Sequence, residues 1–191
     1  MRVVVFDTET TDLVAHDLVP LSRQPKIIEF AAVAATLDAD GEGEITGEIS
    51  ELIYPGEKIT DEITKITNIS NSDLVGKPVF SFLADRIGKF MAGGDAWPND
   101  DGPWLVGHNV MFDQRMCDIE FRRAGFPHWM GANQRLICTV ELTEHMYGFR
   151  RSLGDLYADL FAIGHEGAHR ALVDVKATLR VFRELVKRGI V

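Results

Sequence analysis

Two carboxylates follow an apolar run near the start of the chain. The stretch VVVFDTETTDL begins at Val3 with apolar side chains only, and these are followed by Asp7 and Glu9, which lie two residues apart. On a β-strand this spacing projects both side chains from one face, so we expect the two carboxylates to face a common crevice. Such a pair can bind divalent cations or can simply solvate the end of the strand, and the pair alone does not separate these alternatives.

A second acidic pair, Asp118 and Glu120, has the same spacing in a segment that we expect to be helical. Positions two apart on a helix point well away from each other. We therefore expect this pair to splay into solvent, which makes it an internal control for the first pair.

Two further acids lie at the ends of expected elements. Asp113 falls in the first turn of a helix that follows His108 and Asn109, and Asp174 begins the last helix, five residues after His169. Each acid could merely complement a helix dipole, and the histidine could lie at the surface. A fold of alternating strands and helices would nevertheless gather all four acids at one edge of a sheet.

Convergence of four carboxylates would have an electrostatic consequence. Two unit charges about 4 Å apart repel by roughly 4 kcal/mol at an effective dielectric near 20. The acids must then take up protons or bind cations. A purely carboxylate set of ligands favours Mg²⁺ or Mn²⁺ over zinc.

The composition is that of a soluble protein with one domain, residues 1–191, of which 46% are apolar. No apolar run approaches the ~20 residues of a membrane span, so we expect a cytoplasmic protein with no membrane partner. The net charge of −9 argues against a nucleic-acid partner, but this objection weakens if the acids hold cations. Cys117 and Cys138 have neither disulfide nor metal spacing, and we expect both to be free and buried.

The elements that would position the acids come in two groups. Alternation and β-branched residues predict strands over 2–7, 27–37 and 45–54, and the short turn at 38–44 makes the last two antiparallel. Helices over 60–67 and 79–91 and a loop over 93–103 follow. Strand and helix then alternate: strands at 104–109 and 136–139, helices at 110–124 and from 139 to near 148, and a last helix over about 174–188. This order implies an α/β protein with a mixed sheet and helices on both faces.

Three motifs in order carry a family resemblance. The stretches FDTETT, GHNVMFD and HRALVD resemble the motifs of the DEDDh 3′-to-5′ exonucleases, a family that includes proofreading subunits of bacterial replicative polymerases, ribonuclease T and oligoribonuclease. IIEFAAV and YPGEKITDEITKITNIS are similar to its connecting segments, so the resemblance spans nearly the whole chain. It implies a ribonuclease H-like fold, with a mixed five-stranded sheet in which three antiparallel strands precede parallel ones, flanked by helices on both faces.

The resemblance implies a role for each matched residue of the acidic set. Asp7 would bridge two divalent metal ions, Mg²⁺ or Mn²⁺. Glu9 and Asp174 would hold the first ion, and Asp113 the second. His169 would take a proton from the attacking water, and the ordinary histidine pKa of about 6.5 suits a general base. Two such ions can clamp the attacking and leaving oxygens of a phosphodiester.

Other matched positions imply contacts with substrate. Asn109 and Phe112, together with His108, would shape the pocket around the terminal nucleotide. Thr10 would lie near its 3′ hydroxyl, and Leu13 looks like an apolar wedge between the last two bases.

Several weaker signals have two interpretations. Arg170, and the pair Arg150 and Arg151, are candidate phosphate contacts or ordinary solvated residues at helix starts. Arg122 and Arg123 lie at the C-terminal end of an expected helix, where their positive charges are expected to interact favourably with the helix dipole. The segment 14–26 is either a substrate-facing loop or inert decoration. His165 has no ligand spacing and is expected in a surface loop, and Phe80, Phe82 and Phe90 are expected in the core.

The activity that the resemblance implies is release of nucleoside 5′-monophosphates from the 3′ end of nucleic acid, with single-stranded DNA favoured. The same site would serve a 3′-to-5′ exoribonuclease. A non-catalytic nucleic-acid-binding module is the alternative from another class, and the intact set of acids with His169 speaks against it. The chain ends at Val191 directly after its last helix, so we expect a separate polypeptide, with a DNA polymerase or another replication or repair protein as a partner, or a homodimer, left open.

Overall fold

The computed structural model describes residues 1–165, 167 and 169–191. Its elements follow one another in this order: β1 (Arg2–Thr10), the 3-10 helix η1 (Leu21–Arg23), β2 (Ile27–Leu37), β3 (Gly43–Leu52), α1 (Asp61–Thr67), α2 (Asn71–Leu74), α3 (Phe80–Ala92), β4 (Trp104–Gly107), α4 (Val110–Arg123), β5 (Leu136–Cys138), α5 (Thr139–Tyr147), α6 (Leu153–Phe161) and α7 (Ala171–Lys187).

One mixed sheet organises the molecule, with its strands in the order β3-β2-β1-β4-β5. β1 pairs antiparallel with β2 and parallel with β4, β2 pairs antiparallel with β3, and β4 pairs parallel with β5. The predicted mixed five-stranded sheet is therefore confirmed. The apolar residues of β1 mark it as a central strand because they are buried on both faces.

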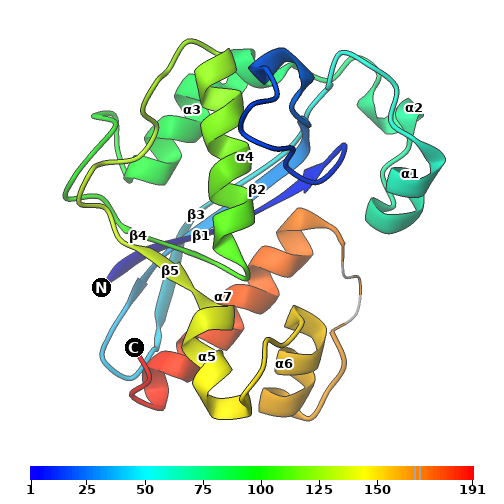
Figure 1. The fold of residues 1–191 in the computed structure, drawn as a ribbon. Coiled ribbons are helices and arrows are strands. Elements are labelled where there is room, and N and C mark those ends of the chain that lie inside the picture. The colour runs from blue at the N-terminus through cyan, green and yellow to red at the C-terminus, as the bar shows by residue number, and fades with distance from the viewer. Residues whose placement is uncertain (166, 168) are drawn as a thin grey trace.

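Helices cover both faces of this sheet, as predicted (Figure 1). Val4 and Phe6 of β1 belong to the core that α3 and α4 complete, whereas Val3 and Val5 pack into the core that α7 completes. Alternation along the strand then places Asp7 and Glu9 on the α7 face and Thr8 on the α4 face. The register of β1 thus decides which helix each polar residue meets.

The structure also corrects several element boundaries. β1 continues to Thr10, so the acidic pair lies within the strand, and α7 begins at Ala171, ahead of Asp174. The sequence reading missed helix α6, although the Ser152 hydroxyl caps it by accepting the backbone N–H of Asp155 at 3.1 Å. A short S-x-x-D motif was the available signal for this helix.

Predictions about the core are confirmed in part. Cys117 and Cys138 are free and buried, as expected. Phe80 is buried, but Phe82 is 81% exposed, so the expectation that it lies in the core is wrong. Helical periodicity places Phe82 two positions from Phe80 and therefore on a different side of α3.

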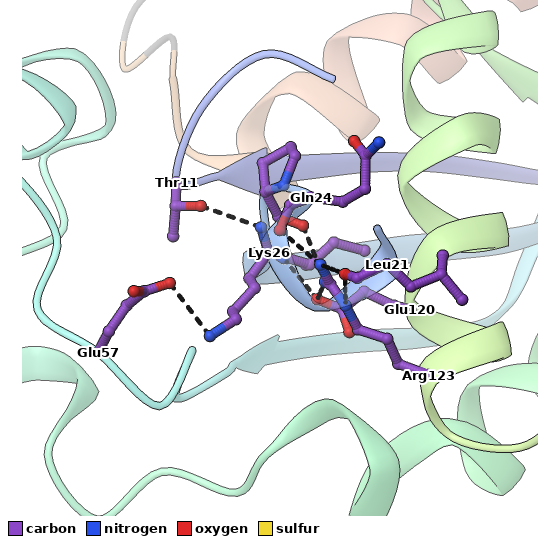
Figure 2. A network of polar contacts seen from close by, with 9 residues as sticks. Thr11, Leu21, Gln24, Lys26, Glu57, Glu120 and Arg123 are labelled. Atoms are coloured by element: carbon purple, nitrogen blue, oxygen red, sulfur yellow. Dashed lines mark hydrogen bonds and ion pairs between the residues drawn. The ribbon is translucent and has the colours of Figure 1, made fainter. Parts of the chain in front are cut away.

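Segment 14–26 folds back onto the C-terminal end of α4, and Arg123 holds it there (Figure 2). The Arg123 guanidinium donates to the carbonyls of Leu21 and Pro25, each at 2.8 Å, and to that of Gln24 at 2.5 Å. It also donates to the Glu120 carboxylate at 3.0 Å. Arg123 lies in the last turn of α4, as predicted, and its side chain has a further role that was not predicted, because it braces this loop.

Glu120 is likewise not in solvent. Its carboxylate is buried and accepts the backbone N–H of Ile27 at 3.2 Å as well as the Arg123 bond. Asp118 accepts the indole N–H of Trp129 at 2.5 Å. The two acids point apart as predicted, but each finds its own partner inside the protein, which corrects the expected solvent exposure.

The helices in the described residues include none that combines the length and the apolar character needed to cross a membrane.

Candidate active site

Three carboxylates meet where β1 ends and α7 begins. Asp7, Glu9 and Asp174 each offer an oxygen, and these oxygens lie within 4.8 Å of one another. The two strand residues arrive there because they share the α7 face of β1. Asp174 arrives because it lies in the first turn of α7, whose N-terminal end points toward the same edge of the sheet. The predicted convergence of these three acids is thus a property of the fold.

The fourth acid approaches from the opposite face. Asp113 is buried in the first turn of α4. Its Oδ1 accepts the backbone N–H of Thr8 at 2.9 Å and the Thr8 hydroxyl at 2.7 Å. Thr8 stands between Asp7 and Glu9, so its two donated bonds hold Asp113 directly beside the acidic pair. The sequence predicted that all four acids belong to the site, but it did not predict that Thr8 positions Asp113.

The electrostatics of the site follow from burial and mutual repulsion. Burial, reinforced by the charges of Asp113 and Glu9, raises the pKa of Asp7 well above its usual range. Burial and the charge of Asp174 raise the pKa of Glu9 to about 8, and burial raises the pKa of Asp113 to about 7. Near neutral pH Asp7 and Glu9 therefore retain protons unless cations offset the charge of the cluster. A donor set of carboxylate oxygens fits Mg²⁺ or Mn²⁺.

His169 lies beside the cluster on a strained piece of backbone. Its φ of 67° is in the left-handed region, which a non-glycine residue adopts at a cost that functional sites often carry. The backbone N–H of His169 donates to Asp174 Oδ2 at 3.0 Å. The exposed side chain lines the same cleft as Asp7.

A second histidine reaches the site and was missed from the sequence. His165 Nε2 lies 2.5 Å from Asp174 Oδ1, and its side chain is only 6% exposed. His165 lies in a loop, as expected, but its side chain is not at the surface. The only sequence signal was its place four residues before His169, in a loop whose path no periodic pattern reveals.

A cleft of about 760 Å³ opens over these residues. It is lined by Asp7, Leu13, His108, Asn109, Phe112, Val140, Arg150, Arg151, Ser152, Leu153, His169 and Asp174. A neighbouring hollow of about 500 Å³ lies between the end of β1 and α1 and includes Glu9 and Thr10 in its lining. Leu13 and Phe112 line both cavities. This placement agrees with a dividing position for Leu13, whose side chain is 75% exposed.

Asp12 precedes Leu13 in the turn that follows β1. Positive φ among the described non-glycine residues occurs at Asn68, Asn109, Ala162 and His169, so Asp12 does not need it. Its Oδ1 instead accepts the backbone N–H of Leu13 at 2.7 Å, and the Thr10 hydroxyl donates to its carbonyl at 2.8 Å. These local bonds restrain the turn that presents Leu13.

His108 lines the cleft, but both of its ring nitrogens already have partners. Nδ1 lies 2.9 Å from the Thr139 hydroxyl, and Nε2 lies 3.1 Å from the carbonyl oxygen of Arg151. Burial lowers the pKa of its imidazole. The structure therefore gives His108 the task of tying β4 to the start of α5 and to the loop before α6.

Arg170 has a protein partner as well. Its guanidinium makes an ion pair with Glu29 at 2.8 Å, and Glu29 also accepts the backbone N–H of Ala171 at 3.0 Å. The Glu29 side chain is 2% exposed. This ion pair holds the first turn of α7 against β2, and the contact of Arg170 with substrate stays a prediction.

The mixed five-stranded sheet with helices on both faces defines an α/β protein with a ribonuclease H-like fold. The nuclease domain of 3'hExo, a DEDDh family member solved with rAMP, superposes with a TM-score of 0.75 at 16% identity, covering 99% of this chain and 93% of that one. Exonuclease I of E. coli in complex with a dT13 oligonucleotide gives a TM-score of 0.73 at 19% identity, covering 98% of this chain and 41% of that one. These likenesses show the shared fold.

The family follows from the sequence match. Residues 4–182 match the model of the exonuclease family named RNase_T, and the chain belongs to that family. The chain is 29% identical over 189 residues to the 3'-5' exonuclease DinG of Bacillus subtilis, covering 98% of this chain and 18% of that protein. It is 30% identical over 189 residues to a PolC-type DNA polymerase III of Staphylococcus aureus, covering 97% of this chain and 11% of that protein. The chain thus spans less than a fifth of the length of these curated relatives.

Proposed function

We propose that this chain hydrolyses phosphodiester bonds at the 3′ end of nucleic acid with the help of two divalent metal ions. The observation that carries the proposal is the meeting of Asp7, Glu9 and Asp174 with oxygens within 4.8 Å of one another. The buried Asp113 lies beside them, and the pKa values of Asp7, Glu9 and Asp113 are raised. Such a cluster is stable in its charged form only when cations occupy it. Membership of the exonuclease family supports the same activity.

Each acid has a place in this proposal. Asp7, Glu9 and Asp174 would hold one ion, because their oxygens lie within 4.8 Å of one another. Asp113 would hold the second ion together with Asp7. Bound ions of this kind lower the pKa of water and neutralise charge on a phosphodiester. Thr8 would keep Asp113 in position through its two donated bonds.

His169 would act as the general base. Its side chain lines the cleft that contains Asp7 and Asp174, and the bond from its backbone N–H to Asp174 fixes the start of the side chain. The imidazole would take a proton from the attacking water and return it to solvent through the open side of the cleft. A general base of this kind contributes about 10² to 10⁴ in rate.

Cleft residues would position the 3′ end of the strand. Leu13 and Phe112 lie where the two cavities meet, which supports stacking of the terminal bases on either side of Leu13. Asn109 would contact the terminal nucleotide, and Thr10 would lie near its 3′ hydroxyl. His108 would act indirectly, through the loop that it holds.

DNA is the substrate that we favour, because the similar bacterial proteins are named as a 3'-5' exonuclease and a DNA polymerase. A DNA polymerase or another replication or repair protein is the corresponding partner, and a homodimer stays a prediction. RNA is the second candidate substrate, since the structural neighbour 3'hExo was solved with rAMP.

The direct test uses two 3′-labelled single strands of the same sequence, one DNA and one RNA. We expect release of labelled nucleoside 5′-monophosphate with Mg²⁺ or Mn²⁺, faster from DNA, and none with chelator. Faster release from RNA would reverse the substrate preference while leaving the chemistry intact. Release from neither polymer under any metal would refute the proposed function.

A further inference from the structure

Three arginines in or next to the cleft were candidate phosphate contacts, and two of them are engaged within the protein. Arg170 is paired with the buried carboxylate of Glu29. Arg151 is paired with Asp159, and its guanidinium lies over the rings of Tyr147 at 5.2 Å and Phe149 at 5.5 Å. Each of these two guanidinium groups already has a carboxylate partner that offsets its charge.

Arg150 is placed differently. Its side chain is exposed and lines the cleft together with Asp7 and His169. Its Nη2 donates to the side-chain oxygen of Asn109 at 2.8 Å. Asn109 is neutral, and the ion pairs found among the described residues do not include Arg150. The bond therefore orients the guanidinium without neutralising its charge.

The loop that carries Arg150 is anchored immediately after this residue. The carbonyl of Arg151 meets His108 Nε2, and Ser152 caps α6. Asn109, with a φ of 63°, precedes the first residue of α4. These contacts hold Arg150 at the rim of the cleft, so little side-chain freedom is lost when it takes up a ligand.

The charge of the chain explains why such a cation is needed. The net charge is −9, and the acids around the cleft repel a polyanion. Metal ions at the carboxylates would offset that repulsion only at the phosphodiester being cleaved. A guanidinium fork suits a phosphate group because it can donate two parallel bonds.

We propose that Arg150 binds a backbone phosphate of the substrate strand inside the cleft. Its hydrogen bond to Asn109 weakens when the phosphate binds. The inference rests on the proposed exonuclease function and adds to it a specific contact for the strand. Arg150 is a binding residue in this view, and the proton transfer and the metal ligands do not involve it.

The test is the salt dependence of KM on a single-stranded DNA of ten thymidines with Mn²⁺, compared for the parent, Arg150→Gln, Arg150→Lys and Arg122→Gln. Arg122 is exposed near the far end of α4, about 18 Å along the helix axis from its start, so its variant removes the same charge beyond the ~10 Å Debye length at 0.1 M salt. For Arg150→Gln we expect KM to rise about fivefold near 0.1 M KCl, as for one exposed ion pair. The slope of log KM against log salt should fall by about 0.7, one single-strand phosphate contact.

The other variants sharpen the outcome. Arg150→Lys should keep the parent slope because it keeps the charge, and Arg122→Gln should match the parent. The kcat of Arg150→Gln should stay within about twofold of the parent, since the residue is absent from the chemistry. Equal slopes for Arg150→Gln and Arg122→Gln, or a lower kcat with an unchanged slope, would overturn the proposal. Absence of activity in the parent would instead refute the proposed function.

Discussion

The pairs Asp7 with Glu9 on β1 and Asp118 with Glu120 on α4 have the same spacing in the sequence and opposite surroundings in the fold. On the strand, both carboxylates face α7 and meet a third acid, Asp174. On the helix, the two side chains point apart, and each finds a donor: Trp129 for one and Arg123 for the other. Identical spacing therefore produces a repelling cluster in one place and two satisfied side chains in the other.

The difference teaches how to separate structural from functional acids. Glu120 is buried with a cation and stabilises the loop between β1 and β2 (Figure 2). The β1 acids are held close to more acids, and burial first and this repulsion second raise their pKa values. Such an arrangement costs stability in the metal-free protein, and that cost is explained by the binding of cations.

The largest expected effect comes from Asp7→Asn compared with Asp118→Asn. The first change removes the carboxylate whose pKa is raised by the charges of all three other acids, and we expect nucleotide release to fall by at least about 10³-fold. The second change keeps an oxygen that can accept the Trp129 bond, so activity should stay near the parent. Initial rates on 3′-labelled DNA measure both, and similar losses in the two variants would remove the distinction between the pairs.

Replacement of His169 by alanine should have the next largest effect on the rate of nucleotide release. We expect the rate to fall by about 10² to 10⁴, because the proposed base is lost while the acids stay. Isothermal titration with Mn²⁺ should give an affinity close to that of the parent. Loss of Mn²⁺ binding in this variant would assign His169 to the metal site instead of to proton transfer.

His165 tests whether the contact with Asp174 matters for metal binding. Removal of a group that orients a metal ligand typically costs 10- to 100-fold in affinity, and we expect a loss of this size for Mn²⁺ in His165→Ala. His165→Gln should recover most of it, because the glutamine amide nitrogen can replace Nε2 as a donor to Asp174. The control is His128→Ala, which changes an exposed histidine. Parent-like affinity in His165→Ala would show that the contact is incidental.

The two acidic pairs should respond with opposite signs in stability. Glu120→Gln leaves the largely buried Arg123 without its counter-charge, and we expect unfolding to become easier by about 2 kcal/mol. Asp7→Asn relieves repulsion, so the metal-free protein should become more stable by about 1 kcal/mol at pH 8. Urea unfolding with chelator measures both. Destabilisation by Asp7→Asn would contradict the repulsive character of the cluster.

The pH dependence of the metal-free protein should show the same repulsion. The pKa of Glu9 is about 8 and that of Asp113 about 7 in the folded chain, both above ordinary carboxyl values. The folded state therefore binds more protons than the unfolded state between about pH 4.5 and 8, and stability is lost as the pH rises through this window. With chelator, we expect Tm to fall by about 3 °C or more from pH 5.5 to pH 8. Mn²⁺ should restore it, and a flat profile would count against the raised pKa values.

Much of this site was predictable because its motifs follow chain periodicity. Alternation in β1 places Asp7 and Glu9 on one face, and the helix starts place Asp113 and Asp174 at the same edge. The contacts of Thr8, His165 and Glu29 were not predictable, because each joins elements far apart in the sequence or lies in a loop without a repeating pattern. The contacts of Arg123 with segment 14–26 were not predictable for a similar reason. A cation at a helix end already has a local explanation, the helix dipole, so the sequence gives no sign of long-range partners.

The most direct test of the central claim is anomalous diffraction from a crystal soaked with Mn²⁺. The account predicts two peaks about 3.5–4 Å apart, one among Asp7, Glu9 and Asp174 and one between Asp7 and Asp113. Absence of any peak among these four carboxylates would contradict it.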